Sequence, residues 1–217
     1  MKIYIIRHGE TEGNQKQQLN GWSDIPLTSM GIDLAMQTGK ALRGETFDIA
    51  YSSPLIRAEQ TAILLLKESG NEKTPLIFDN RIKEIFAGDW EGISVNDSKN
   101  PERNREIRNY LEHPKSDWGF PSGETIQQVK QRTQEFLMEV AKGPQQNILV
   151  STHGCALRCM LNFLYGDTAD LWQGHIPYNC AVSIVSIENG CMKLIESDRI
   201  YYDPALCVDR YSINEET

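Results

Sequence analysis

Residues 3–6 (Ile-Tyr-Ile-Ile) constrain the fold more than any other segment, because every position is apolar or aromatic and β-branched residues dominate. Such a run is typical of a strand buried on both faces, which occurs mainly inside a parallel sheet. Further strands are predicted at 47–51, 76–78 and 147–150. Helical patterns separate these strands, and this alternation predicts an α/β fold.

Helix start and stop signals fill the intervals between the predicted strands. Thr28 is a candidate N-cap ahead of apolar residues with a spacing of 3–4. Ser53 is expected to cap the next helix, with Pro54 at its first helical position. Ser122 is expected to cap a third helix that Gly143-Pro144 stops.

The C-terminal part of the chain carries a hairpin signal. Residues 181–187 and 192–195 flank Glu188-Asn189-Gly190, so these last strands are expected to be antiparallel. The pattern as a whole predicts a three-layer α/β sandwich with a mostly parallel sheet and helices on both faces. We expect a single domain over 1–217, with a helical insertion at roughly 85–142 that caps the active site.

Composition limits the ligands that such a fold would bind. The chain has 217 residues, 22 Lys and Arg against 30 Asp and Glu, a formal net charge of −8 and a pI near 5.1. General nucleic-acid binding needs a basic surface and is therefore excluded. A small anion can still bind where a few cations are concentrated in one pocket. Apolar runs are too short for a signal peptide or a bilayer span, so a cytoplasmic protein is expected.

The cysteines give no disulfide or zinc pattern. Their number, 5, is odd, all lie in the last third of the chain, and no Cys-x-x-Cys occurs. A reducing compartment fits this usage. Cys155 directly follows His153-Gly154, and its redox sensitivity stays open at this stage.

Polar residues follow the predicted strands at the points where those strands end. Arg7 and His8 follow the first strand, Arg57 lies one turn into the helix after the second, and His153-Gly154 follows the strand at 147–150. In an open parallel sheet, ligands bind beyond the carboxyl ends of the strands. Arginine pairs with phosphate oxygens through a planar fork of donors, and helix N-termini add N–H groups. The sequence therefore predicts a phosphate site.

Two further residues complete a plausible phosphoryl-transfer chemistry. A neutral histidine such as His8 is a competent nucleophile toward phosphorus. A carboxylic acid is also needed to protonate the leaving alkoxide. Glu84 is the best candidate, because it follows the strand at 76–78 and precedes the insertion.

Five segments, in this order, resemble those of the histidine phosphatase superfamily, the phosphoglycerate-mutase-like proteins. They are residues 5–14, which hold the Arg-His-Gly-Glu-Thr signature, and 20–28, 51–62, 83–92 and 151–154. The likeness covers most of the chain to about Tyr165. Arg-His-Gly alone would be a weak signal, whereas five ordered matches are specific.

The resemblance implies a role for each matching residue. His8 would become phosphorylated, and Glu84 would protonate the leaving group and then activate water. Phosphate and substrate would be bound by a set of polar residues and glycines: Arg7, Asn14, Asn20, Gly21, Arg57, His153 and Gly154. Arg7, Arg57 and His153 would also stabilise the charge of the transition state, so no metal and no cofactor is expected.

The family contains phosphatases and bisphosphoglycerate-dependent phosphoglycerate mutases, which differ in the acceptor of the phosphoryl group. Mutases of the family carry a Tyr and a Lys after the acid and then an adjacent Arg pair. Here Glu84 is followed by Ile85-Phe86, and no two arginines of the insertion are adjacent. Glu91 matches an acidic position that the phosphatases carry, and 121–125 resembles their Gly-Glu-Ser segment. These features favour the phosphatase branch.

The sequence thus predicts a metal-independent phosphomonoesterase that hydrolyses small phosphorylated metabolites through phosphohistidine. Residues 93–120 are expected to set its specificity. Two alternatives stay open, a bisphosphoglycerate-dependent phosphoglycerate mutase and a non-catalytic phosphate-binding regulatory module. The expected partner is a small phosphorylated substrate, with no nucleic acid and no membrane. A homodimer stays open because dimers occur in the family.

Overall fold

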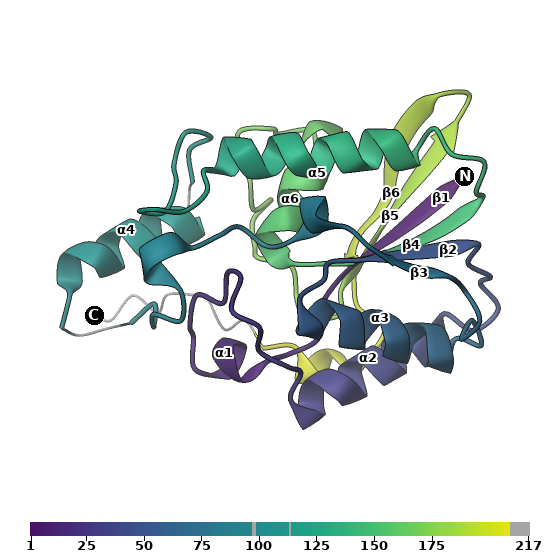
Figure 1. Ribbon diagram of the computed structural model, residues 1–217, viewed down its shortest axis with the longest axis horizontal. Helices are drawn as coiled ribbons and strands as arrows, with labels where there is room; N and C mark the ends of the chain where they lie inside the picture. The colour runs from purple at the N-terminus through teal and green to yellow at the C-terminus, as the bar shows by residue number, and fades with distance from the viewer. Residues whose placement is uncertain (97–98, 113, 209–217) are drawn as a thin grey trace.

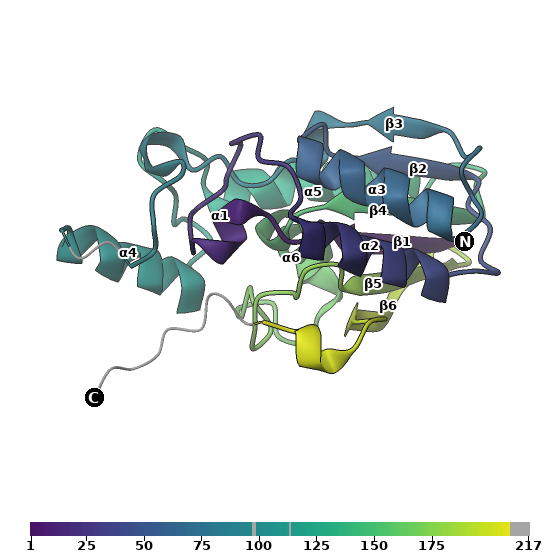
Figure 2. The same cartoon turned by 90° about the horizontal axis from the view of Figure 1, so that it is seen from below.

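A six-stranded, mostly parallel sheet forms the centre of the computed structural model (Figures 1 and 2), which describes residues 1–96, 99–112 and 114–208. The rest of the expected domain and insertion lies outside the described residues. The strands are β1 (Lys2–Arg7), β2 (Ile49–Ser52), β3 (Leu76–Phe78), β4 (Asn147–Thr152), β5 (Val182–Glu188) and β6 (Cys191–Arg199). Their order is β3-β2-β4-β1-β5-β6. β1 to β4 pair in parallel, and β5 and β6 are antiparallel, as predicted.

Helices cover both faces of this sheet, which confirms the predicted α/β layers. They are α1 (Glu12–Gln15), α2 (Ser29–Ala41), α3 (Ile56–Glu68), α4 (Pro101–Glu112), α5 (Ile126–Val140) and α6 (Gly154–Leu161). In Figure 1, α2 and α3 lie below the sheet while α5 and α6 lie above it. In the described ranges, no helix has the length and apolar character needed to cross a membrane.

The alternation of side chains along β1 explains why both faces need a helical layer. Tyr4 and Ile6 are buried in the core cluster that contains residues of α2 and α3. Ile3 and Ile5 point the other way, into the cluster formed with α5 and α6. Successive strand residues face opposite sides of a sheet, so a strand that is apolar throughout needs cover on both.

Two predicted helix starts are wrong by a few residues. α3 begins at Ile56 rather than at Pro54, and Ser53 does not cap it: its hydroxyl accepts from the Leu55 N–H and contacts a histidine of the site. α5 begins after Thr125, whose side chain forms a capping box with Gln128. That box satisfies two otherwise unpaired N–H groups at once, which a lone serine at 122 does not achieve.

The region expected as an insertion, roughly 85–142, divides into parts with different positions. α4 lies away from the sheet at one end of the molecule, whereas α5 packs along α6 in the upper helical layer (Figure 1). Tyr110 and Ile107 of α4 are buried in a third apolar cluster, which also contains residues of α5 and α6. α4 is thereby attached to the main body beside the carboxyl ends of the strands.

The turn after β1 leaves no room for a side chain at Gly9. A Cβ atom there would lie 2.5 Å from the carbonyl oxygen of Gly31, in the first turn of α2. The Gly31 oxygen belongs to the backbone, which cannot rotate aside as a side chain does, and the backbone also fixes where a Cβ atom would lie. The turn after β1 and α2 are therefore in direct contact.

Replacing Gly9 by alanine should lower the free energy of unfolding by about 1–3 kcal/mol, the usual effect of overpacking. Chemical denaturation of the variant and the wild type measures this difference. Gly166→Ala is the matched control, because a Cβ atom at Gly166 meets nothing within 4 Å. An equal loss of stability in both variants would contradict the steric explanation.

Candidate active site

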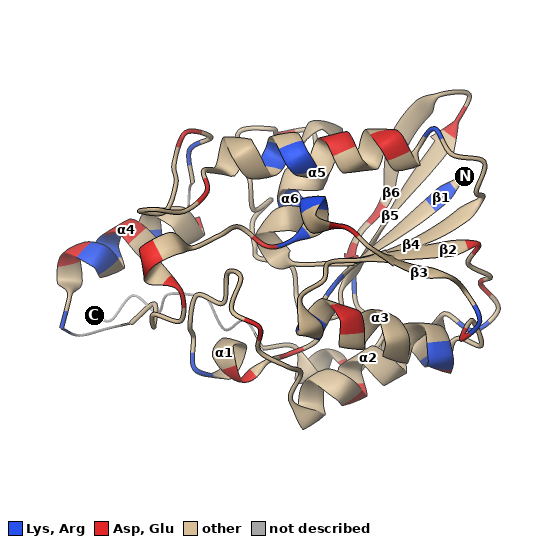
Figure 3. Cartoon of the chain, in the orientation of Figure 1, with Lys and Arg blue, Asp and Glu red and all other residues tan. Residues whose placement is uncertain are grey.

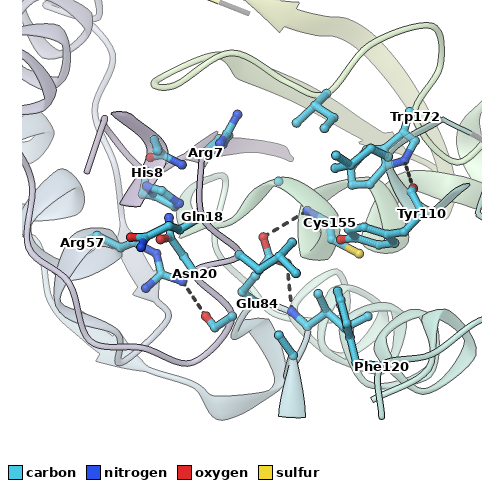
Figure 4. A pocket seen from close by; sticks show the side chains of 18 residues that line it. Arg7, His8, Gln18, Asn20, Arg57, Glu84, Tyr110, Phe120, Cys155 and Trp172 are labelled. Atoms are coloured by element: carbon cyan, nitrogen blue, oxygen red, sulfur yellow. Dashed lines mark hydrogen bonds between the residues drawn. The ribbon is translucent and has the colours of Figure 1, made fainter. Parts of the chain in front are cut away.

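One pocket, with about 530 Å³ of open space including the solvent at its mouth, lies at the carboxyl ends of the parallel strands (Figure 4). β4 lies between β1 and β2, so the residues that follow these strands meet at the same edge of the sheet. Most of the residues predicted for the site line this pocket: Arg7, His8, Asn14, Asn20, Gly21, Arg57, Glu84 and Gly154. His153 is buried beside it, with its ring centroid 5.2 Å from that of His8.

The backbone fixes the orientation of the His8 ring. Nδ1 lies 2.7 Å from the carbonyl oxygen of Gly9. A carbonyl oxygen only accepts, so Nδ1 carries the proton and Nε2 holds the lone pair. Burial, followed by the positive charges of Arg57 and Arg7, lowers the pKa of His8 well below its usual range. The ring is therefore a neutral imidazole whose Nε2 is suited to nucleophilic attack.

Two buried guanidinium groups supply positive charge beside His8. Arg57 is fully buried and donates to the carbonyl oxygens of Gly21 and Ser23, both at 2.7 Å. Arg7 donates to the carbonyl oxygen of Pro177, and its buried Nε has no hydrogen-bond partner. These backbone contacts fix the two cations in place, and the Nε of Arg7 keeps a donor for an anion.

His153 is the N-cap residue of α6 and is fully buried. Its Nε2 lies 2.8 Å from the hydroxyl of Ser53, while its Nδ1 is buried without a partner. Burial, and then the charge of Arg57, lowers the pKa of His153 well below its usual range. An unpaired buried nitrogen is unfavourable, so His153 Nδ1 is available for a further hydrogen bond.

The Glu84 carboxylate is held at the start of α6. Its Oε1 accepts from the N–H groups of Ile85 at 2.9 Å and Ala156 at 3.1 Å, and its Oε2 accepts from Cys155 at 3.2 Å. A helix N-terminus favours a negative side chain, and His153 makes no side-chain cap bond there. These bonds fix the position of Glu84. In Figure 4 it lies between two groups of side chains, which are Arg7, His8 and Arg57 on one side and Tyr110, Phe120 and Trp172 on the other.

Asn14 combines a structural contact with a place in the pocket. Its side chain accepts from the N–H of Thr11 at 3.0 Å and closes the capping box of α1. Asn20 donates to the Thr11 hydroxyl at 3.2 Å, and its buried Oδ1 has no hydrogen-bond partner. Thr11 thus links the two asparagines along one wall.

Glu91 has a structural role in the site that the sequence did not reveal. Its carboxylate accepts from the N–H groups of Trp22, Ser23 and Ala87, and from the Ser23 hydroxyl at 2.7 Å. These bonds fix the loop whose carbonyl oxygens hold Arg57. The family resemblance marked Glu91 as a shared acidic position, but only the contacts show what it holds.

Glu91→Gln should weaken inorganic phosphate binding about tenfold, because the amide NH₂ replaces an acceptor and the Arg57 loop loosens. Competitive inhibition by phosphate measures the effect. Glu139→Gln, at the far end of α5, is the control. Unchanged phosphate inhibition in the Glu91 variant would show that the loop does not depend on this carboxylate.

Arg132 and Glu124 hold the segment that carries Glu84. The Arg132 guanidinium donates to the carbonyl oxygens of Arg81, Lys83 and Glu84 at 2.6–2.9 Å, and to both carboxylate oxygens of Glu124 at 2.8 Å. Glu124 also accepts from the Phe86 N–H. Sequence reasoning assigned no role to Arg132, since its partners include backbone carbonyls that any residue provides.

The two buried histidines should make stability depend on pH. Their folded-state pKa values lie below the unfolded value of about 6.5, so below this pH the unfolded chain binds protons that the folded chain does not. The contribution of the two neutral histidines to the free energy of unfolding is fully present above pH 6.5. It is lost as pH falls toward the folded-state pKa values, by up to about 1.4 kcal/mol per pH unit for each histidine. His8→Asn should lose stability less steeply than wild type between pH 6.5 and 5 in chemical denaturation, and equal slopes would contradict this.

Cys155 lines the pocket but is not poised for reaction. It is buried, and its Sγ lies 3.8 Å from that of Cys159. Burial raises its pKa well above the usual range, so the reactive thiolate is disfavoured. In the described part of the chain, no group of His, Cys, Asp and Glu side chains is arranged to hold a metal ion.

The fold places the protein in the class of α/β sandwiches that have their pocket at the carboxyl ends of parallel strands. Residues 3–198 match the family model of the histidine phosphatase superfamily (branch 1), and the chain belongs to this family. The resemblance stated from the sequence is thereby confirmed.

Named relatives include both mutases and phosphatases. A 2,3-bisphosphoglycerate-dependent phosphoglycerate mutase of Methylobacterium sp. (strain 4-46) is 32% identical over 185 residues, 79% of this chain and 87% of that protein. Bacillus stearothermophilus YhfR is similar in structure, with a TM-score of 0.83 and 28% identity over 92% of this chain and 97% of that one. A putative alpha-ribazole-5'-P phosphatase from Escherichia coli str. K-12 substr. MG1655 has a TM-score of 0.76 and 28% identity, over 92% and 98%.

Proposed function

We propose that the protein is a metal-independent phosphomonoesterase that hydrolyses small phosphorylated metabolites through a phosphohistidine at His8. The observation that carries this proposal is the 2.7 Å contact between His8 Nδ1 and the Gly9 carbonyl oxygen. It leaves Nε2 unprotonated in a pocket that also contains Arg7, Arg57 and Glu84. A nucleophile, two cations and an acid therefore share one site.

Two in-line displacements account for the reaction. In the first, Nε2 of His8 forms a bond to phosphorus, the bond from phosphorus to the ester oxygen breaks, and protonated Glu84 gives its proton to that oxygen. In the second, water attacks phosphorus, the Glu84 carboxylate takes a proton from the water, and the N–P bond breaks. Arg7, Arg57 and His153 hold the phosphoryl oxygens in both steps.

The charge pattern favours hydrolysis over mutase activity. Among the pocket-lining residues that the structure describes, the Lys and Arg side chains are Arg7 and Arg57, both at the His8 end (Figure 4). A phosphoglycerate also carries a carboxylate that needs its own cation. Elsewhere, Arg and Glu are interspersed along α4 (Figure 3), and this mixed charge suits a small phosphate ester and not a polyanion.

Rapid acid or base quenching during turnover of a ³²P-labelled monoester tests the proposal. We expect an acid-labile, base-stable phosphoenzyme and phosphate release that persists in the presence of EDTA. Turnover without any phosphoenzyme would overturn the covalent mechanism. Absence of phosphate release across a broad panel of monoesters would instead support the phosphate-binding module.

The mutase is the second candidate, because the relatives include named phosphoglycerate mutases. A coupled assay with 3-phosphoglycerate and catalytic 2,3-bisphosphoglycerate distinguishes the two functions. We expect net phosphate release to exceed isomerisation. Rapid bisphosphoglycerate-dependent isomerisation with little free phosphate would overturn the phosphatase proposal.

A further inference from the structure

We infer that the end of the pocket opposite the arginines binds an apolar ring, so that the preferred substrates are phosphate monoesters whose alcohol carries an aromatic group. This inference rests on the proposed function, since it concerns the group that the phosphate ester carries. The side chains at this end take no part in phosphoryl transfer.

Aromatic side chains from separate segments form a fixed wall there. They are Tyr110 of α4, Phe120 ahead of α5, and Trp172 in the loop before β5 (Figure 4). The Tyr110 ring centroid lies 5.1 Å from that of Phe120 and 5.6 Å from that of Trp172, both in edge-to-face geometry. Trp172 Nε1 donates to the Tyr110 carbonyl oxygen at 2.8 Å, which fixes the indole. Such a wall can receive another ring without reorganising.

The surroundings of this wall offer few hydrogen bonds to a polar group. The other pocket-lining members of the same hydrophobic cluster are Leu19, Ile85, Ala87, Leu111, Cys155 and Ile176. Burial raises the pKa of Tyr110 well above its usual range, so its hydroxyl stays neutral. The hydroxyl groups of a sugar would lose their water here without gaining enough partners, which is unfavourable.

The order of side chains along the pocket determines the orientation of a bound phosphate ester. Arg7, His8 and Arg57 lie at one end, and the aromatic wall lies at the other (Figure 4). Glu84 lies between them, so the acid of the proposed mechanism separates the phosphoryl end from the aromatic end. A phosphoryl group beside His8 therefore directs the carbon part of the ester toward the aromatic wall.

The test compares two esters of primary alcohols, 3-phenylpropyl phosphate and glycerol 3-phosphate. Both need the same proton from the acid, so the comparison isolates the apolar contact. We expect kcat/KM for the phenylpropyl ester to be about tenfold higher or more, the gain expected from burying a ring. Equal values, or a preference for glycerol 3-phosphate, would overturn the inference.

A pair of matched leucine variants tests whether the preference for the phenylpropyl ester arises at this end of the pocket. Leu111 is half-buried and lines the pocket, whereas Leu64 is a partly buried leucine of α3 that packs in a different core cluster. Leu111→Asn should reduce the ratio of the two kcat/KM values about fivefold or more, while Leu64→Asn leaves it within about twofold. A similar change in both variants would overturn the assignment of the subsite.

Binding of unreactive phosphonates separates this inference from the proposed function. We expect 4-phenylbutylphosphonate to bind about tenfold more tightly than 4-hydroxybutylphosphonate in calorimetry. That result without turnover of any ester would refute the phosphatase and support the subsite. Turnover combined with equal affinities would support the phosphatase and refute the subsite.

Discussion

His8→Asn should lower kcat for phosphate release by at least about a thousandfold and abolish the phosphoenzyme, because no other nucleophile replaces Nε2. Asparagine keeps a polar side chain of similar reach toward the Gly9 carbonyl oxygen, so the turn after β1 should persist. Steady-state phosphate release and rapid-quench labelling measure the two effects.

His175→Asn is the matched control for this variant. His175 lies outside the residues that line the pocket and is 39% exposed at its side chain. We expect its kcat within about twofold of wild type, as for surface substitutions. Phosphoenzyme formation that survives His8→Asn would assign the nucleophile to another residue and refute the proposed mechanism.

Glu84→Gln should lower kcat/KM by a factor that depends on the leaving group of the substrate. For an alkyl phosphate, kcat/KM should fall by about 10²–10⁴, the usual contribution of a general acid. For 4-nitrophenyl phosphate the loss should be far smaller, because nitrophenolate leaves without a proton. Kinetics on both substrates measure the difference between the two losses.

The leaving-group pattern also tests Arg132. Arg132→Met removes the bonds that hold the backbone of Glu84, so it should reproduce part of the selective loss on alkyl esters. Glu188→Gln, at the exposed end of β5, serves as the control.

An equal loss of kcat/KM on both substrates in Glu84→Gln would show that the Glu84 carboxyl group does not protonate the leaving group.

Local sequence patterns were sufficient to predict most of the framework. The apolar run at 3–6 predicted a doubly covered strand, and Asn189-Gly190 predicted the β5–β6 turn, where both residues have positive φ. These features depend on neighbours in the chain, so residue type and spacing carry the information. The helix starts near Ser53 and Ser122 were wrong for different reasons. The first N–H of α3 donates to Asp24, a residue distant in the sequence, whereas α5 is capped by the local Thr125–Gln128 capping box.

The candidate site was predictable to the extent that its residues have distinctive chemistry. Arg7, His8 and Arg57 follow strands that the pattern had already located, and the sheet order brings them together. Glu91 and Arg132 gave no comparable signal of their roles, because they act through backbone N–H and carbonyl groups. Every residue offers those groups, so a sequence cannot show which of them a side chain will reach.

The sequence by itself determined the class of fold, the family and the residues suited to phosphoryl transfer, because periodicity and side-chain chemistry are properties of the chain. Only the tertiary structure decided which nitrogen of His8 is free, what holds Glu84, and that Tyr110, Phe120 and Trp172 form one wall. The physical reason is that the Glu84 contacts and the aromatic wall depend on distances between segments far apart in the sequence, which packing sets after the local elements have formed. The His8 contact joins adjacent residues, and it depends on the backbone conformation of the turn after β1.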